Sequence, residues 1–130
     1  MKPIGIDHVV LRVRDRAVAE AFYIDVIGCV LERRQDKIGM TQVRAGSSLI
    51  DLVQIDGVLG QQGGAAPGVE GRNLDHFCIA IEGFDIDAVR AELRAKGVEP
   101  GEEGDRFGAS GLSRSIYLQD PDGNGLELRG

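Results

Sequence analysis

The sequence contains no tryptophan, and aromatic residues make up only 5% of its 130 residues. So few rings argue against a surface on which nucleobases stack. No stretch approaches the roughly 18 consecutive apolar residues of a membrane span, and the segment MKPIGIDH lacks the apolar core of a signal peptide. The 21 acidic residues outnumber the 15 lysine and arginine residues, so the formal net charge is −6, and the positive charges are spread along the chain. We therefore expect neither nucleic-acid binding nor membrane binding.

Cysteine and histidine are equally scarce, with two residues of each. Cys29 and Cys78 form no C-x-x-C pair, and we expect both to be reduced, partly buried thiols in a cytoplasmic protein. The hydrophobic fraction of 42% and the charged fraction of 28% are ordinary for a globular chain. A chain of this length can form one compact unit with a hydrophobic core, or two very small ones.

What the sequence does contain is an internal repeat. IDHVVLRVRDRAVAEAFYIDVIG, which starts at Ile6, corresponds to LDHFCIAIEGFDIDAVRAELRAKG, which starts at Leu74. The only two histidines, His8 and His76, occupy the same place in both copies. We expect a single domain of two modules, at about 4–56 and about 74–130, joined by a glycine-rich linker at 57–73.

Each copy is predicted to fold as β-α-β-β-β, which gives an α+β fold of two tandem βαβββ modules around one cleft. Alternation gives DHVVLRV and DHFCIAI one apolar face and one mixed face that carries the histidine. A helix follows each of these strands. The first begins at Asp15 or Arg16 and ends at Gly28, with Val18, Ala21, Phe22 and Val26 at helical spacing, and the second runs from Ile86 to Gly97.

The remaining strands are expected at CVLERRQD, MTQVRA and SLIDLVQI in the first copy, and at VEPGEE, SRSIYLQ and GLELR in the second. A second glycine-rich stretch, PGEEGDRFGASG from Pro100 to Gly111, is predicted to be a mobile loop beside a site.

An acid lies in the last strand of each copy, Asp51 in the first and Glu127 in the second. Strand glutamates usually face solvent, which is the alternative for Glu127. Two histidines and two carboxylates in apolar strands would, however, be costly to bury unless they were paired or bound to a cation. Imidazole and carboxylate groups are typical ligands of a catalytic Zn, Ni, Mn or Fe(II) ion.

The sequence resembles the vicinal oxygen chelate superfamily, which includes glyoxalases, bleomycin-resistance proteins, type I extradiol dioxygenases, fosfomycin-resistance proteins and methylmalonyl-CoA epimerases. The resemblance covers essentially the whole chain and rests on DHVVLRVRD, AFYIDVIG, LDHFCIAI and YLQDPDGNGLEL. It implies that His8, His76 and Glu127 bind a divalent metal ion (Ni, Zn, Mn or Fe(II)), with Asp51 at the fourth ligand position. Asp51 either binds the metal directly, acts through a water or only accepts a hydrogen bond. The resemblance also implies a homodimer.

The resemblance leaves three functions open. The first is a glyoxalase-like lyase or isomerase, in which an enediolate forms from a hemithioacetal or α-hydroxycarbonyl substrate, including thiol adducts. Asp51 and Glu127 are then the catalytic carboxylates, and Asp51 moves the proton. Arg12 favours this function, because glutathione-dependent glyoxalases carry an arginine there that meets a substrate carboxylate; its alternative is a solvated strand-end cation. Ile55 stands where those enzymes have an asparagine.

The second function is a ring-cleaving dioxygenase, for which His8, His76 and Glu127 form a two-histidine, one-carboxylate triad. Related dioxygenases carry a further acid–base histidine, and Tyr117 is a possible substitute that contacts substrate, or else an ordinary strand aromatic. The third function is a non-catalytic protein that binds a small toxic compound such as an antibiotic. We rank the lyase or isomerase first, the dioxygenase second and the binding protein third.

Overall fold

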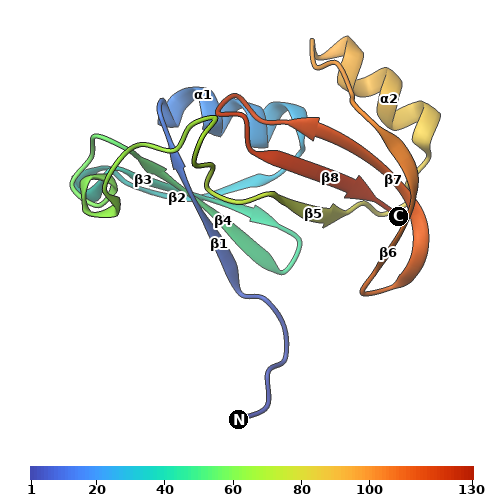
Figure 1. Ribbon diagram of the computed structural model, residues 1–130, viewed down its shortest axis with the longest axis horizontal. Coiled ribbons are helices and arrows are strands. Elements are labelled where there is room, and N and C mark those ends of the chain that lie inside the picture. Colours follow the sequence, from blue (N-terminus) through green and yellow to red (C-terminus); the bar gives the residue numbers. More distant parts are fainter. The chain divides into compact units, whose positions relative to one another are not determined.

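The computed structural model describes all residues, 1–130. The chain divides into two compact units, Met1–Asn73 (unit 1) and Leu74–Gly130 (unit 2), which are labelled by element in Figure 1. Both units have the predicted order β-α-β-β-β. The elements are β1 (His8–Val13), α1 (Arg16–Ala21), β2 (Val30–Gln35), β3 (Met40–Ala45), β4 (Ser48–Gln54), β5 (His76–Ala80), α2 (Ile86–Ala95), β6 (Glu103–Gly108), β7 (Gly111–Gln119) and β8 (Gly125–Arg129). Neither helix has the length and apolar character needed to cross a bilayer.

Each unit contains one four-stranded sheet with the same topology. The strand order is β1-β4-β3-β2 in unit 1 and β5-β8-β7-β6 in unit 2. The first strand of each unit pairs in parallel with the last, and the other pairs are antiparallel. Asp51 lies opposite Val10, and Glu127 lies opposite Cys78. Because side chains alternate along a strand, each acid therefore shares a sheet face with the histidine of its own unit.

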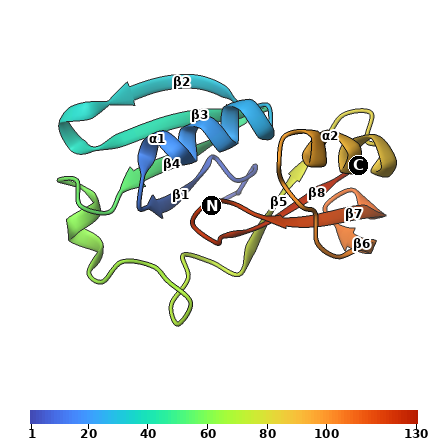
Figure 2. The ribbon, with the colours of Figure 1, turned by 90° about the horizontal axis from the view of Figure 1, so that it is seen from above.

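The other sheet face of unit 1 forms a hydrophobic core with α1, which lies along that face in Figure 2. Leu11 and Val13 are fully buried on it, as the alternation predicts. The Asp15 side chain caps α1 by accepting bonds from the backbone N–H groups of Ala17 and Val18, at 2.9 and 3.1 Å. The positive φ of Gly28, 87°, follows the end of the helical segment.

The predicted buried stripe of the first helix is only partly correct. Val18 is 50% exposed and Ala21 is exposed, whereas Ala19, Phe22 and Tyr23 are buried. The burial of both Phe22 and Tyr23 coincides with a π-helical turn, Phe22–Val26, that directly follows α1. Its wider winding changes the angular spacing between residues, so that the adjacent rings of Phe22 and Tyr23 both point inward.

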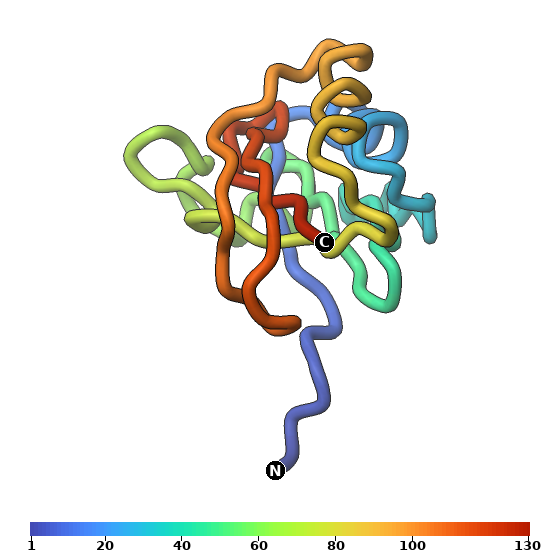
Figure 3. Tube along the Cα trace, turned by 90° about the vertical axis from the view of Figure 1, so that its right-hand side faces the viewer, coloured from blue at the N-terminus to red at the C-terminus, as the bar shows by residue number.

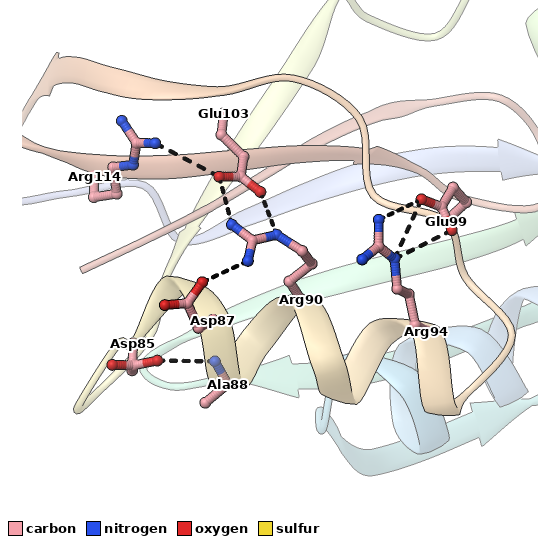
Figure 4. A network of polar contacts seen from close by, with 8 residues as sticks. All are labelled: Asp85, Asp87, Ala88, Arg90, Arg94, Glu99, Glu103 and Arg114. Atoms are coloured by element: carbon pink, nitrogen blue, oxygen red, sulfur yellow. Dashed lines mark hydrogen bonds and ion pairs between the residues drawn. The ribbon is translucent and has the colours of Figure 1, made fainter.

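Unit 2 holds its helix α2 with charged groups as well as with apolar contacts. Leu93 is the only buried residue of α2. Figure 4 shows the Arg90 guanidinium between the carboxylates of Glu103 on β6 and Asp87 on α2, at 2.7 and 2.5 Å. Glu103 also lies 3.5 Å from Arg114 of β7. The network fixes α2 to the sheet through side chains from three elements.

The expectations for the glycine-rich stretch PGEEGDRFGASG and for VEPGEE are wrong. The stretch is not an irregular loop, because Glu103–Gly108 forms the edge strand β6, which pairs with β7 along its length. Figure 3 shows these strands side by side. VEPGEE contributes only its last residue to a strand. Gly104 and Gly108 serve close packing rather than a loop, because a Cβ at either would overlap the side chain of Arg106 or Arg129.

Candidate functional site

Glu127 lies in the middle of β8 and is only 6% exposed. Its Oε1 accepts a hydrogen bond from Ser115 Oγ at 2.5 Å, and its Oε2 accepts one from the Tyr117 hydroxyl at 3.2 Å. The same Oε2 lies 3.5 Å from Nε2 of His76 on β5. A buried carboxylate is thus held between the two strands that flank β8, and the solvent-facing alternative for Glu127 is wrong.

His76 is oriented by its neighbours in unit 2. Its Nδ1 lies 2.6 Å from Oδ1 of Asp75, and its ring meets the Tyr117 ring edge-on, with centroids 5.6 Å apart. A carboxylate that accepts the proton of Nδ1 favours the tautomer in which Nε2 carries a free lone pair. His76 therefore presents Nε2, on the side of Glu127, as the nitrogen that can bind a metal ion.

Unit 1 repeats this arrangement. His8 Nδ1 lies 2.7 Å from Oδ1 of Asp7. The hydrogen bond with Asp7 raises the pKa of His8, and the negative charge of Asp51 raises it further. The imidazole of His8 thus lies in a negative environment that favours a cation, whether a proton or a metal ion.

Asp51 on β4 is as buried as Glu127, at 6% exposed. Its Oδ1 accepts a hydrogen bond from Gln42 Nε2 of β3 at 2.9 Å. Gln42 Oε1 in turn accepts a bond from Arg33 Nε at 2.6 Å, which fixes the orientation of the amide. No hydrogen bond to Asp51 Oδ2 is formed, so that oxygen remains available to a ligand or a proton.

Four residues that hold these groups were not identified from the sequence, namely Asp7, Asp75, Gln42 and Ser115. The repeated Asp-His dipeptide was a usable signal for the first two, because an acid adjacent to each histidine can bind its Nδ1. Gln42 and Ser115 could be found only from the strand register, which places them opposite Asp51 and next to Glu127.

Arg12 lies at the end of β1 and holds the predicted linker. Its Nη1 donates to the carbonyls of Gly63 and Ala65 at 2.8 and 3.0 Å, and its Nη2 donates to that of Gly64 at 2.8 Å. Asn73 bonds the Arg12 backbone through its side-chain amide. The alternative of a solvated strand-end cation does not describe this residue. Its predicted contact with a substrate carboxylate stays a prediction.

The two cysteines are free and differ in burial: Cys29 is buried, whereas Cys78 is exposed, contrary to the expectation of two partly buried thiols. Burial raises the pKa of each thiol to about 11, and the Glu127 charge contributes at Cys78. Both side chains are therefore neutral thiols at pH 7, and neither is an activated nucleophile.

The four predicted metal ligands fall into two pairs, which we call half-site 1 (His8 and Asp51) and half-site 2 (His76 and Glu127). Neither unit by itself brings together three or more histidine, cysteine, aspartate or glutamate side chains that could hold a metal ion. The donor set nevertheless fits a divalent metal: each half-site has one oriented imidazole and one buried carboxylate. Each half-site can supply two ligands, and neither supplies a full coordination sphere.

Residues 5–128 match the family described as the Glyoxalase/Bleomycin resistance protein/Dioxygenase superfamily. A comparison with curated proteins gave no match. Many solved structures are similar, among them a virulence protein from Salmonella typhimurium with 27% sequence identity, a TM-score of 0.81 and coverage of 99% of this chain and 98% of that one.

A lactoylglutathione lyase from Agrobacterium tumefaciens has 22% identity and a TM-score of 0.72, with 99% and 95% of the two chains covered. An antibiotic binding protein from a Streptomyces species has 20% identity and a TM-score of 0.71, with 99% and 97% covered. At these identities the two structures show the fold and not the activity. They confirm the predicted α+β fold of two βαβββ modules.

Proposed function

Because this chain belongs to the Glyoxalase/Bleomycin resistance protein/Dioxygenase superfamily, we propose that it is a metal-dependent lyase or isomerase of the glyoxalase type. Its substrate is a small molecule with two adjacent oxygens, such as a hemithioacetal or an α-hydroxycarbonyl compound. One observation carries the proposal, and it holds in both units. A histidine on the first strand has its Nδ1 bonded to the preceding aspartate. A buried carboxylate lies on the neighbouring last strand, two residues beyond the position opposite that histidine.

His8, His76 and Glu127 would hold the metal ion, which is Ni, Zn, Mn or Fe(II). When bound, such an ion acts as a Lewis acid that aligns the two substrate oxygens and stabilises negative charge on them. Ser115 and Tyr117 keep the Glu127 carboxylate in place through its two oxygens. Asp7 and Asp75 keep the two imidazoles in the tautomer that binds through Nε2.

Asp51 would carry the proton between adjacent carbons of the substrate. Gln42 binds only one of its oxygens, so Oδ2 can accept and return a proton while the carboxylate keeps its orientation. Direct binding of Asp51 to the metal and proton transfer by Oδ2 are compatible, because the two oxygens are distinct. Arg12 and Tyr117 are proposed as substrate contacts. Burial raises the pKa of Tyr117, so its hydroxyl stays protonated and can donate.

A second candidate function is the dioxygenase, and the position of Tyr117 favours it. Its hydroxyl bonds Glu127 and its ring contacts His76, so an acid group lies beside two members of the triad. A non-catalytic binding protein is the third candidate, and the antibiotic binding protein of the same fold is the reason to retain it.

The test is to load the purified protein with each of the four metals and assay two reactions. Hemithioacetal isomerisation supports the lyase or isomerase, and oxygen uptake with catechols supports the dioxygenase. If the lyase or isomerase is correct, the isomerase activity must be lost in Asp51→Asn. It must be kept in Asp56→Asn, which removes an exposed carboxylate just beyond β4. Tight binding of small molecules with no turnover under any metal would leave the binding protein as the function.

We also propose a homodimer with two equivalent metal sites, which the resemblance supports. In such a dimer the half-sites that share an ion come from one chain or from two. Arg12 bonds both Ala65 and Asn73, so the linker is held to β1 of unit 1 at both places. An exchange of units between chains that keeps these contacts must therefore cross over after Asn73, where unit 1 ends. Light scattering that gives a monomer mass across micromolar concentrations would contradict the dimer.

A further inference from the structure

Arg129 is a buried cation that contacts no carboxylate. It lies on β8 two residues after Glu127, so its side chain leaves the same face of the unit 2 sheet. The residue is only 6% exposed. Its Nη2 donates to the backbone carbonyls of Gly111 and Arg106, at 2.7 and 3.2 Å. Backbone carbonyls orient the guanidinium but do not neutralise its charge.

The rest of the guanidinium has no acceptor within the protein. An arginine has five N–H donors, and the two carbonyls account only for those of Nη2. Nε is buried and unpaired. Nη1 makes no hydrogen bond and lies over Gly108, where a Cβ would come within 1.5 Å of it. Glycine at this position leaves the room that the guanidinium occupies.

Arg12 provides an internal contrast, because its Nε is the only other buried side-chain nitrogen or oxygen without a hydrogen-bond partner. Both Nη atoms of Arg12 are used by the carbonyls of 63–65, so that guanidinium is committed to the linker. In Arg129 Nη1 as well as Nε is unused. A guanidinium whose buried Nε has no acceptor and whose charge meets no carboxylate is costly, and a bound anion would offset that cost.

We propose that Arg129 recognises an oxyanion, namely a carboxylate, phosphate or sulfonate group, on the molecule that binds this face of unit 2. The forked guanidinium matches such groups better than any other side chain does. Glu127 does not fill this role, because its carboxylate contacts Ser115, Tyr117 and His76 and forms no ion pair with Arg129. The Cα atoms of Glu127 and Arg129, two positions apart on β8, are roughly 6.6 Å apart, a distance that a small molecule can bridge. The substrate class is therefore an anion whose charged group is separate from its two adjacent oxygens, and this last step rests on the proposed function.

The anion site is tested first in the full chain without metal, with inorganic phosphate as the probe. Nuclear magnetic resonance of the arginine Nε–Hε groups should show a saturable shift at Arg129 and none at Arg12. Arg129→Gln should abolish the phosphate-induced rise in melting temperature, and Arg106→Gln should retain it. A phosphate response that is equal at both arginines, or that persists in Arg129→Gln, would overturn the proposal.

Arg129→Lys covers the case in which Arg129→Gln does not fold. It keeps the charge and loses the fork, and we expect phosphate affinity to fall about 10- to 100-fold. Unchanged affinity would contradict recognition by the fork.

The metal-loaded protein is then titrated with malate and with lactate, which share the α-hydroxycarboxylate and differ by one carboxylate. The wild type should prefer malate, and Arg129→Gln should lose that preference while its affinity for lactate is unchanged. An equal affinity of the wild type for both would exclude the anionic substrate class. A phosphate response without any metal binding would instead refute the proposed function and leave the anion site in place.

Discussion

Asp51 in unit 1 and Glu127 in unit 2 occupy equivalent strands and are equally buried, yet their surroundings differ. Glu127 has hydrogen bonds to both oxygens and lies 3.5 Å from His76 Nε2. Asp51 has one hydrogen bond, from Gln42, and one free oxygen. A fixed carboxylate suits a metal ligand, and a carboxylate with a free oxygen suits a proton carrier. The difference shows how two copies of one module can keep the same residues and divide the chemistry between them.

The helices of the two units differ in a parallel way. The helical segment of unit 1 buries Ala19, Phe22 and Tyr23 against its sheet. In unit 2, Leu93 is the only buried residue of α2, and an ion pair between Arg90 and Glu103 joins the helix to β6. Apolar burial does not titrate, whereas an ion pair depends on pH and is screened by salt. Unit 1 also has an ion pair between its helix and its sheet, from Glu20 of α1 to Arg34 of β2. The difference between the two units therefore lies in the greater apolar burial of the helical segment of unit 1.

The largest expected effect separates the two carboxylates. Asp51→Asn removes the proton carrier but keeps the hydrogen-bonding shape, so turnover should fall by about 10²–10⁴ while weakened metal binding persists. Glu127→Gln should lose metal and turnover together. Steady-state kinetics and metal content of each variant measure both quantities. Near-normal turnover of Asp51→Asn would contradict the assignment of Asp51 as proton carrier and Glu127 as metal ligand.

The next effect compares the cores at equivalent positions. Leu11 on β1 and Ile79 on β5 each lie three residues after the histidine of their unit, and Leu11 is fully buried whereas Ile79 is not. We expect Leu11→Ala to lower the free energy of unfolding by about 2–5 kcal/mol, and Ile79→Ala to lower it less. Urea unfolding followed by circular dichroism gives both values. Equal losses would show that the two sheets are equally well packed.

A smaller effect concerns the groups that hold the carboxylates. Removing both donors to Glu127, in the double variant Ser115→Ala and Tyr117→Phe, should weaken metal affinity about 10- to 100-fold. Gln42→Leu should change metal affinity less and reduce turnover more. It removes the hydrogen bond that orients Asp51, the proposed proton carrier, and leaves the metal ligand Glu127 in place. Competition with a chelator measures the affinities. The reverse order would assign the ligand role to Asp51.

The smallest effect is the pH dependence of the ion pair between Arg90 and Glu103 in unit 2. The hydrogen bond with Arg90 lowers the pKa of Glu103 from its ordinary 4.5. A lowered pKa means that this stabilisation is present above pH 4.5 and is lost as the pH falls through the folded-state value. Melting curves between pH 7 and pH 3 should therefore differ between the wild type and Arg90→Gln at neutral pH and converge in acid. Arg94→Gln, whose partner Glu99 is mostly exposed, is the matched control and should change little.

The element order and the faces of the central strands could be predicted from the sequence because they depend on local periodicity. Val9, Leu11 and Val13 alternate with His8 and Val10, and that alternation alone decides which face joins the core. The presence of one histidine and one acid in each copy was equally visible. These features need no knowledge of which strands are neighbours.

The partners of the carboxylates could not be predicted, because they depend on register between strands. Gln42 reaches Asp51 only because β3 pairs with β4 in a particular alignment, and Ser115 reaches Glu127 for the same reason on β7. β6 was missed because Gly104 and Gly108 give it the composition of a loop. Their role is to leave room for arginine side chains, which composition does not reveal.

The parallel pairing of the first and last strand in each unit has a consequence for folding kinetics. The antiparallel hairpin from β3 to β4 involves short loops and can form early. The pairing of β1 with β4 must close a much longer segment of chain, whose entropic cost is met only when the sheet is nearly complete. Each half-site consists of a residue on the first strand and a residue on the last. We expect the ligand pairs to form late in the folding of each unit, so that a metal ion binds after the sheet has formed and does not nucleate it.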